Sequence, residues 1–212
     1  MAKFTKWADR PGSRRYNRLR GTTSYPVTYQ DWANDAGNYN SGIIGDGPII
    51  GTNRSISAPA LSAWRGHPVT KEEMMALGLE EAREIMKVQF WDKMLGDKIQ
   101  SQLIAEFTGD MKSSTGNIRI LQNALNNLGA KLSTDGSMGT GTLTALNDTL
   151  QRKGEKAVYE QMRIEAIKFF NKLSNRKFGE AQVKHLNEDY PEYEQLAADR
   201  KEGTKSNSKK KS

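Results

Sequence analysis

The side chains that most often carry chemistry are scarce in this chain. It has no cysteine, and its two histidines, His67 and His185, stand far apart in the sequence. We therefore expect neither a metal site nor a Ser-His catalytic pair, and we predict no cofactor. The segment 45–53 lacks the Gly-Lys-Ser/Thr ending of a phosphate-binding loop. Carboxylates remain as groups that could transfer a proton, with Asp35 and Asp46 as candidates.

Residues 118–146 have the pattern of two short helices joined by a glycine-containing connection. Leucines at helical spacing form one apolar face of the first helix: Leu121, Leu125 and Leu128. Gly129 is placed to end that helix, Asp135-Gly136 indicates a tight turn, and Gly139 permits a further bend. The segment resembles a peptidoglycan-binding helical repeat. The alternative is an ordinary helical hairpin with a glycine-rich connection.

Residues 64–103 resemble the middle of glycoside hydrolase family 108 lysozymes and the related secretion-activator proteins. The landmarks are Gly66, Pro68-Val69-Thr70, Glu81-Ala82, Phe90-Trp91-Asp92-Lys93, Gly96-Asp97 and Ser101-Gln102. Before them, the family's G-x-T-N-x-G-I-T segment is matched at Thr52, Asn53, Ile56 and Ser57. The resemblance covers roughly residues 28–180. It implies a lysozyme-like fold and an N-acetylmuramidase ancestry.

The family's general acid is a glutamate in an E-G-G-Y motif, and here the resemblance places Ala36-Gly37-Asn38-Tyr39. A methyl group cannot donate a proton, so we predict that catalysis is lost and assign no catalytic residue. Asp35 and Asp46 are the alternative acids. On a helix, a shift of one residue turns the side chain of Asp35 by about 100 degrees. Asp35 also suits a helix end, and Asp46 suits a turn.

Four residues fall where the resemblance places the sugar-binding groove: Tyr39, Thr52, Asn53 and Ser57. The two glycines that precede the family's Thr-Asn pair are replaced by Ile49-Ile50, and the loop is two residues longer. Asn38 adds bulk at the expected mouth of the groove. We therefore predict weak glycan affinity.

Charge is concentrated at the two ends of the chain. Residues 1–27 carry a net charge of +6 and residues 199–212 carry +4, whereas residues 28–198 carry −3. Such basic segments bind polyanions: nucleic acid, an acidic partner surface or an anionic cell-wall polymer. The alternative is that they are solubilising tails.

Large apolar residues interleave with the basic residues of the first segment, which is unusual for a free tail. We predict an arm that becomes ordered on a partner subunit of a large assembly. The candidate contact residues are Lys3, Lys6, Trp7, Arg10, Arg14, Arg15, Arg18 and Arg20.

The sequence predicts a mostly α-helical, lysozyme-like domain with extended basic N- and C-terminal arms. Helices are expected at about 28–34, from Thr70 with a Thr70–Glu73 capping box, and over 79–95, 99–107, 117–128, 140–152, 155–173 and 178–186, with an irregular piece near 108–116. We place domain boundaries at 1–27 (basic arm), 28–112 (muramidase-like region), 113–190 (peptidoglycan-binding-like region) and 191–212 (basic tail).

Three functions remain open. The first is a lysozyme-like protein without catalysis, retained as a structural or wall-interacting component of a bacteriophage particle; the second is an active peptidoglycan hydrolase with a relocated carboxylate. The third is a nucleic-acid-binding protein that uses its basic arms. No apolar run approaches the length of a membrane span, and residues 1–20 lack the hydrophobic region of a signal peptide. We therefore expect synthesis in the cytoplasm and association with a virion.

Overall fold

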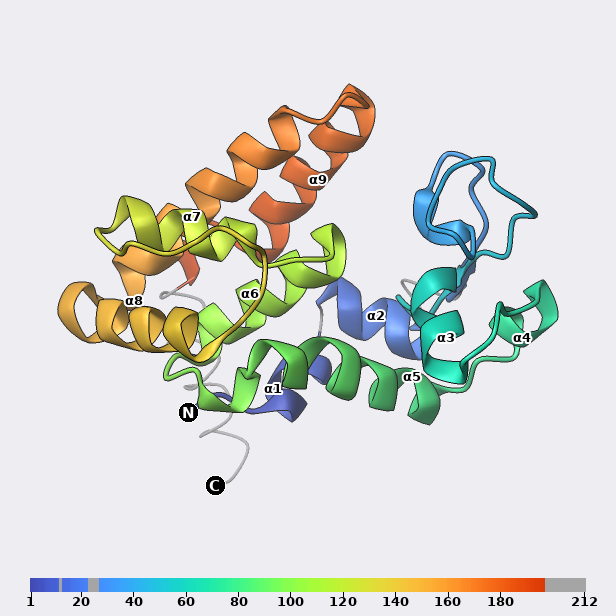
Figure 1. Cartoon of the computed structure of the whole chain (residues 1–212), viewed down its shortest axis with the longest axis horizontal. Coiled ribbons are helices and arrows are strands. Elements are labelled where there is room, and N and C mark those ends of the chain that lie inside the picture. Colours follow the sequence, from blue (N-terminus) through green and yellow to red (C-terminus); the bar gives the residue numbers. More distant parts are fainter. Residues whose placement is uncertain (12, 23–26, 197–212) are drawn as a thin grey trace, which may run out of the picture. The chain divides into compact units, whose positions relative to one another are not determined.

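The computed structural model describes residues 1–11, 13–22 and 27–196 (Figure 1). The chain divides into two compact units. The N-terminal unit is Lys3–Asp97, and the described part of the C-terminal unit is residues 98–196 together with Met1 and Ala2. Both units are built mainly from helices, which confirms the predicted fold class. In the described ranges, no helix combines the length and the apolar character that a bilayer span needs.

The helices and strands of the N-terminal unit are short. In chain order they are α1 (Phe4–Ala8), α2 (Arg14–Arg20), β1 (Tyr29–Gln30), η1 (Ala36–Asn38), β2 (Thr52–Asn53), α3 (Ala58–Arg65), α4 (Lys71–Met75), α5 (Leu79–Ile85), η2 (Met86–Trp91) and η3 (Asp92–Met94), followed at the boundary by η4 (Gly96–Lys98). The capping box that opens α4 is confirmed. Glu73 N donates to Thr70 Oγ1 over 3.2 Å, and Thr70 N donates to Glu73 Oε2 over 2.7 Å.

Residues 79–95 form the predicted helical run, but the run changes its winding. It begins as α5, widens into the π-helix η2 and tightens into η3 before Leu95 takes a left-handed conformation, with φ of 52°. Gly96 follows because a Cβ atom there would lie 2.4 Å from the ring of Trp91. The indole of Trp91 is fully buried, and its Nε1 donates to Asp97 over 2.7 Å. The family-like residues 90–97 thus form one packing unit.

The N-terminal segment is not an extended arm in its described part. Trp7 is fully buried and stacks on Trp91 with 5.4 Å between ring centroids. The guanidinium of Arg15 lies 4.2 Å from the centroid of Trp7 and donates to the Trp7 carbonyl. Asp9 accepts hydrogen bonds from Arg83 of α5 and Arg20 of α2. The arm prediction is wrong for residues 3–22 because their apolar side chains bury against their own domain.

Residues 28–34 do not form the predicted helix. Tyr29 and Gln30 instead pair antiparallel with Asn53 and Thr52. The strand also positions the side chain of Tyr29. Its ring lies over Gly51, where an added Cβ would come within 2.4 Å of the ring, and its hydroxyl donates to Ile50 O over 3.0 Å. Long-range pairing overrides local helix propensity at this site.

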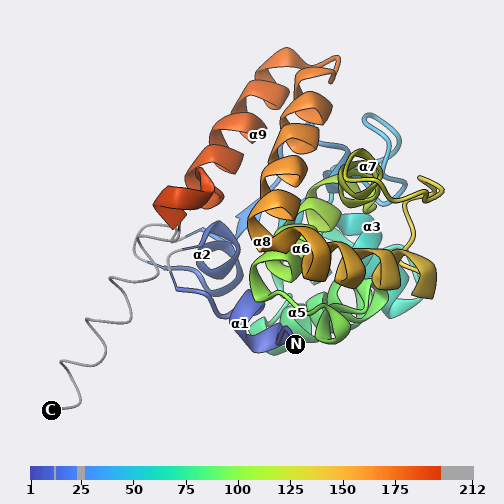
Figure 2. The same cartoon turned by 90° about the vertical axis from the view of Figure 1, so that its left-hand side faces the viewer.

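The C-terminal unit contains four longer helices. They are α6 (Gln102–Thr115), α7 (Arg119–Asn127), α8 (Thr140–Asn171) and α9 (Arg176–Asp189). Both α7 and α9 pack on α8, and α9 runs back along its second half as a helical hairpin (Figures 1 and 2). Gly154, with φ of 82°, interrupts α8 between the two predicted helices 140–152 and 155–173.

The core of this unit is aromatic. Phe107 of α6 stacks on Tyr190 with 4.3 Å between centroids, and Tyr159 of α8 packs beside both rings. The predicted irregular piece at 108–116 is wrong, since α6 continues to Thr115. Thr108 fits inside the helix because its hydroxyl donates to the carbonyl of Ile104 over 2.7 Å.

The connection between α7 and α8 has the predicted turns. Gly129 and Gly136 adopt positive φ values of 99° and 87°. Gln122, which is 1% exposed, binds the turn from both of its amide atoms: its Oε1 accepts from Gly136 N over 2.8 Å, and its Nε2 donates to Asp135 Oδ1 over 2.9 Å. This hydrogen bond from Gln122 is the largest cause that lowers the pKa of Asp135.

The two compact units part at Asp97, whereas the sequence places a boundary after residue 112. Helix α6 packs with α8, so it joins the C-terminal unit. Of the predicted basic tail, residues 191–196 are described: Pro191 O accepts from the Tyr159 hydroxyl over 2.6 Å, and the Tyr193 hydroxyl donates to Glu155 over 3.0 Å. The basic cluster at 200–211 lies outside the described residues.

Candidate functional site

The short helix η1 carries the position at which the sequence resemblance places the family's acid. Ala36 is its first residue, half-buried, and offers only a methyl group. Asp35 lies immediately before η1 and caps its N-terminal end, as the helix-end prediction indicates. Its Oδ1 accepts from Gly37 N over 2.9 Å, so this carboxylate caps the turn. The carboxylate of Asp35 is therefore engaged in holding the turn.

Asp46 lies in an exposed loop that leaves the fold after Asn38 and returns beside the same residue. The carbonyl of Asn38 accepts from Ile50 N over 2.8 Å and from Gly51 N over 3.1 Å, which closes the loop between them. Asp46 N donates to Ile43 O over 3.2 Å in a tight turn, as its turn-forming sequence indicates. Its carboxylate has no hydrogen bond or ion pair with another described residue. No described residue is thus in place to assist Asp46 in catalysis.

Tyr39, Thr52 and Ser57 lie beside η1. Three of the four predicted groove residues make internal hydrogen bonds through their side chains. Tyr39 is 4% exposed, and its hydroxyl donates to Ala33 O over 2.9 Å. Asn53 is 3% exposed, and its Nδ2 donates to the last carbonyls of α4, at 2.9 Å from Met74 O and 3.2 Å from Met75 O.

The other two predicted groove residues lie against Gly37. Thr52 Oγ1 donates to Gly37 O over 3.4 Å, and Ser57 stands at the start of α3 with its Cβ 3.3 Å from the Cβ position of Gly37. Glycan contact by the four residues stays a prediction. Asn38 does not crowd a groove mouth as predicted: it is fully buried and donates from Nδ2 to Trp32 O over 2.9 Å.

The family-like Thr-Asn segment makes a two-residue turn after β2. Arg54 and Ser55 both adopt left-handed conformations, with φ of 51° and 64°, and Asn53 and Ile56 exchange backbone hydrogen bonds. The family's glycine falls at Ser55, where its freedom at positive φ explains its use. Sequence analysis missed Arg54, whose Nη1 donates to Leu19 O over 2.6 Å and whose Nε donates to Leu77 O over 3.0 Å.

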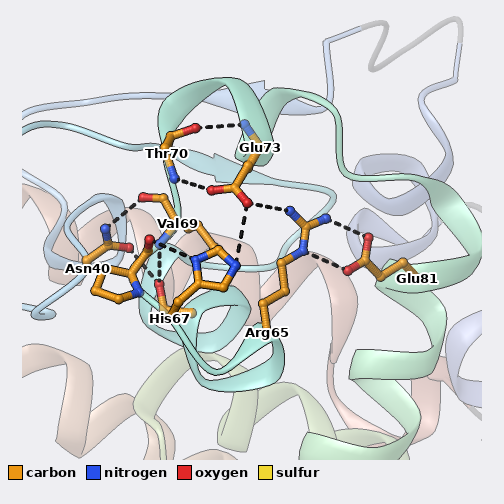
Figure 3. A network of polar contacts seen from close by, with 9 residues as sticks. Asn40, Arg65, His67, Val69, Thr70, Glu73 and Glu81 are labelled. Atoms are coloured by element: carbon orange, nitrogen blue, oxygen red, sulfur yellow. Dashed lines mark hydrogen bonds and ion pairs between the residues drawn. The ribbon is translucent and has the colours of Figure 1, made fainter.

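A polar network links α3, α4 and α5 (Figure 3). Arg65 donates to both carboxylate oxygens of Glu81, over 3.0 and 2.8 Å, and lies 3.6 Å from Glu73. His67, half-exposed, lies 3.6 Å from the same Glu73 carboxylate. The hydrogen bonds to Glu81 are the largest cause that raises the pKa of Arg65. These carboxylates join α3, α4 and α5 through Arg65.

A second branch of this network fixes the turn before α4 (Figure 3). Ser62 Oγ donates to Asn40 Oδ1 over 2.7 Å and accepts from Val69 N over 3.1 Å, while Asn40 Nδ2 donates to Val69 O over 2.8 Å. The family-like Gly66-to-Thr70 segment is thereby held against the residues that follow Tyr39. Sequence analysis did not find this network, because its members lie up to 29 positions apart.

The predicted partner-binding residues of the N-terminal segment lie on or next to α1 and α2. Trp7 and Arg15 are buried, and Arg20 Nη2 donates to Asp9 over 2.9 Å. Their binding to a polyanion or a partner subunit stays a prediction. Across the described ranges, no group of three His, Asp or Glu side chains is arranged to hold a metal ion.

Comparison with known families assigns both halves of this chain. Residues 25–116 match the glycosyl hydrolase 108 family, and residues 116–191 match the family described as a predicted peptidoglycan domain. The chain thus contains a glycosyl hydrolase 108 region followed by a peptidoglycan-domain region. The family resemblance seen in the sequence is thus confirmed.

A solved structure has the same fold as this chain. SagA of Brucella abortus superposes with a TM-score of 0.62 at 22% identity, over 76% of this chain and 83% of that chain. At this identity the likeness concerns the fold. No curated protein sequence matches the chain.

Proposed function

We propose that this protein binds peptidoglycan without cleaving it. The observation that carries the proposal is Ala36, which stands where the family resemblance places the glutamate that protonates the glycosidic oxygen. General acid catalysis contributes about 10² to 10⁴ in rate, and glycoside hydrolysis commonly needs a pair of carboxyl groups. A methyl group supplies neither.

The surrounding carboxylates offer no ready substitute. Asp35 caps η1 through the Gly37 amide, and Glu73 and Glu81 lie against Arg65. Each of these contacts engages the carboxylate within the fold. Asp46 is a turn residue in an exposed loop.

Binding to peptidoglycan is supported by the family match over residues 116–191. A binding protein of this fold would serve as a structural or wall-contacting component. A bacteriophage particle is the setting that the sequence resemblance suggests.

Release of soluble muropeptides from purified sacculi tests the proposal. We expect the unaltered protein, Asp35→Asn and Asp46→Asn to release no more than buffer does. Release by the unaltered protein that either Asn variant abolishes would instead establish an active hydrolase with a relocated acid.

A gain-of-function variant sharpens this test. Ala36→Glu restores the family's donor, and Ala36→Gln is the matched control with the same size and no acid. Hydrolysis by the Glu variant alone would support loss of the acid as the cause of inactivity. Sedimentation with the same sacculi measures binding independently of cleavage.

A further inference from the structure

The turn between α8 and α9 contains a small pocket in the C-terminal unit. Its volume is about 270 Å³, and it is lined by Phe170 and Asn171 from the end of α8 and by Arg176 and Glu180 from the start of α9. The two helices lie side by side in Figures 1 and 2. The pocket is large enough for one or two amino-acid residues and too small for a folded partner.

Close helix packing gives this pocket a rigid floor. An added Cβ at Gly179 would lie 2.4 Å from the carbonyl oxygen of Phe170, so a glycine lets the two helices approach here. Phe170 itself is 2% exposed and presents an apolar base. Asn175 caps α9, with its Oδ1 accepting from Phe178 N over 3.1 Å.

The two charged residues of the pocket are not used by the fold. Arg176 and Glu180 lie one helical turn apart on α9 and are both exposed. Neither side chain makes a hydrogen bond or ion pair with any other residue of 1–11, 13–22 or 27–196. An acid four residues after a base is the less favourable order for a helical ion pair, which is consistent with their separation. Both groups remain available to a ligand.

The rim adds positive charge and exposed aromatic surface. Lys172 and Lys177 are exposed beside the turn. Phe169 is 38% exposed and Phe178 is 47% exposed. These lysines do not line the pocket and add only diffuse charge attraction. The ligand that suits Arg176, Glu180 and Phe170 has a carboxylate, an ammonium group and an aliphatic part between them.

We propose that this pocket binds the peptide stem of peptidoglycan at a diamino residue. Arg176 forms a two-point hydrogen bond with a carboxylate of the stem, and Glu180 binds the side-chain ammonium group of the diamino acid. Phe170 packs against the aliphatic part between them, and Asn171 can bind a peptide group. The inference rests on the proposed function, since it names the part of peptidoglycan that the C-terminal unit recognises.

The pocket favours a peptide over a phosphate polymer. A phosphodiester has no ammonium group for Glu180, and the Glu180 carboxylate would repel it. Arg176 matches the planar, two-oxygen geometry of a carboxylate.

Calorimetric titration of the full chain with a synthetic stem tripeptide, L-alanine, γ-D-glutamate and diaminopimelate, tests the proposal. We expect Arg176→Gln and Glu180→Gln each to weaken binding roughly tenfold, because each removes a charge-assisted hydrogen bond. Lys177→Gln is the matched control: it removes the same charge one residue away and should change affinity less than about twofold. Circular dichroism verifies that each variant stays folded.

Altered peptides identify the group that each residue binds. Acetylation of the free side-chain ammonium should weaken binding as much as Glu180→Gln does. The two changes together should lower the affinity no more than either change alone. Equal losses in Arg176→Gln and Lys177→Gln would overturn the proposal in favour of diffuse charge attraction. Displacement of the tripeptide by inorganic phosphate at equal concentration would overturn it as well.

Sedimentation with whole sacculi separates this inference from the proposed function. Sacculus binding that Arg176→Gln and Glu180→Gln leave unchanged would overturn the pocket and leave the proposed function standing. Failure of the unaltered protein to bind sacculi would overturn both. The release of soluble muropeptides is measured separately on the same samples, and neither variant should alter it.

Discussion

Polar side chains are used differently around η1 and at the α8–α9 turn. Around η1, Tyr39 and Asn53 donate to backbone carbonyls and are buried. At the α8–α9 turn, Arg176 and Glu180 line a pocket without a bond to any described residue. Polar side chains that hydrogen-bond to buried backbone groups stabilise the fold, whereas charged side chains without a partner in the fold are available to a ligand. The residues of the family-like site are therefore expected to hold the fold, and those of the α8–α9 pocket to bind.

This difference suggests a protein in which the hydrolase unit is kept for its structure. Asn53 joins β2 to α4, Arg54 joins the same turn to α2, and Arg65 joins α3 to α5. None of these bonds depends on the side chain at position 36. Under the proposed function, selection for a stable domain would preserve the family-like motifs without hydrolysis.

The largest expected effect is from Trp7→Ala in the N-terminal unit. Removing a fully buried indole that stacks on Trp91 should destabilise this unit by about 3–5 kcal/mol. Urea unfolding followed by tryptophan fluorescence measures the change. Phe178→Ala, which removes a ring that is 47% exposed, is the control and should cost far less. A small effect of Trp7→Ala would restore the interpretation of residues 3–22 as an arm.

Asn53→Ala is expected to have the next largest effect. It leaves the carbonyls of Met74 and Met75 without their side-chain donor and should cost about 1–3 kcal/mol of unfolding free energy. Asn171→Ala, at an exposed residue of the pocket, should stay within about 0.5 kcal/mol. Thermal unfolding provides both values. If Asn53→Ala instead unfolds at the same temperature as the unaltered protein but loses sacculus binding, the comparison between the two regions fails.

The smallest expected effect is from Asp9, which joins α1 to α2 and α5. Its pKa is lowered, first by hydrogen bonding from Arg83. A lowered pKa in the folded state means that Asp9 contributes stability above its unfolded value of 3.8, and that this contribution is lost as the pH falls through the folded value. Asp9→Asn should therefore cost about 1 kcal/mol at pH 7, a figure reduced by partial exposure.

Unfolding at two pH values checks the Asp9 prediction. The difference between the unaltered protein and Asp9→Asn should shrink once the pH is well below 3.8, because protonation then removes the same charge from the unaltered protein. A difference that is the same at both pH values would show that the pair with Arg83 contributes no charge-dependent stability. Asp31→Asn is a suitable control, since its pair with Lys71 is exposed.

Much of the helical structure could be predicted because its signals are local. The Thr70–Glu73 capping box, the leucine face of α7 and the turns at Gly129 and Gly136 each depend on a few neighbouring residues. Local patterns failed at residues 28–34, where Tyr29 pairs with a strand more than twenty positions later. They also failed at 108–116, where threonine hydroxyls bond within the helix instead of ending it.

The candidate site shows the same division. The resemblance that places Ala36 at the acid position rests on the sequence, and no tertiary contact can turn its methyl group into a proton donor. The α8–α9 pocket and the Arg65 network had no sequence signal, because an exposed Arg, Glu or His looks alike whether or not a partner lies nearby. Only the distances between side chains in the folded protein show which of these residues have a partner.

The sequence by itself determined the family, the helical class and the absence of the expected acid, since these depend on residue identity and short-range spacing. Only the tertiary structure decided whether the described part of the N-terminal basic segment is an arm or a folded element. Its seven Lys and Arg residues among large apolar groups were compatible with an arm or a folded element. The presence of Trp91 and Arg83, about eighty positions later, gave Trp7 a stacking surface and Asp9 a cation. Burial of the indole then outweighed the entropy of a free chain.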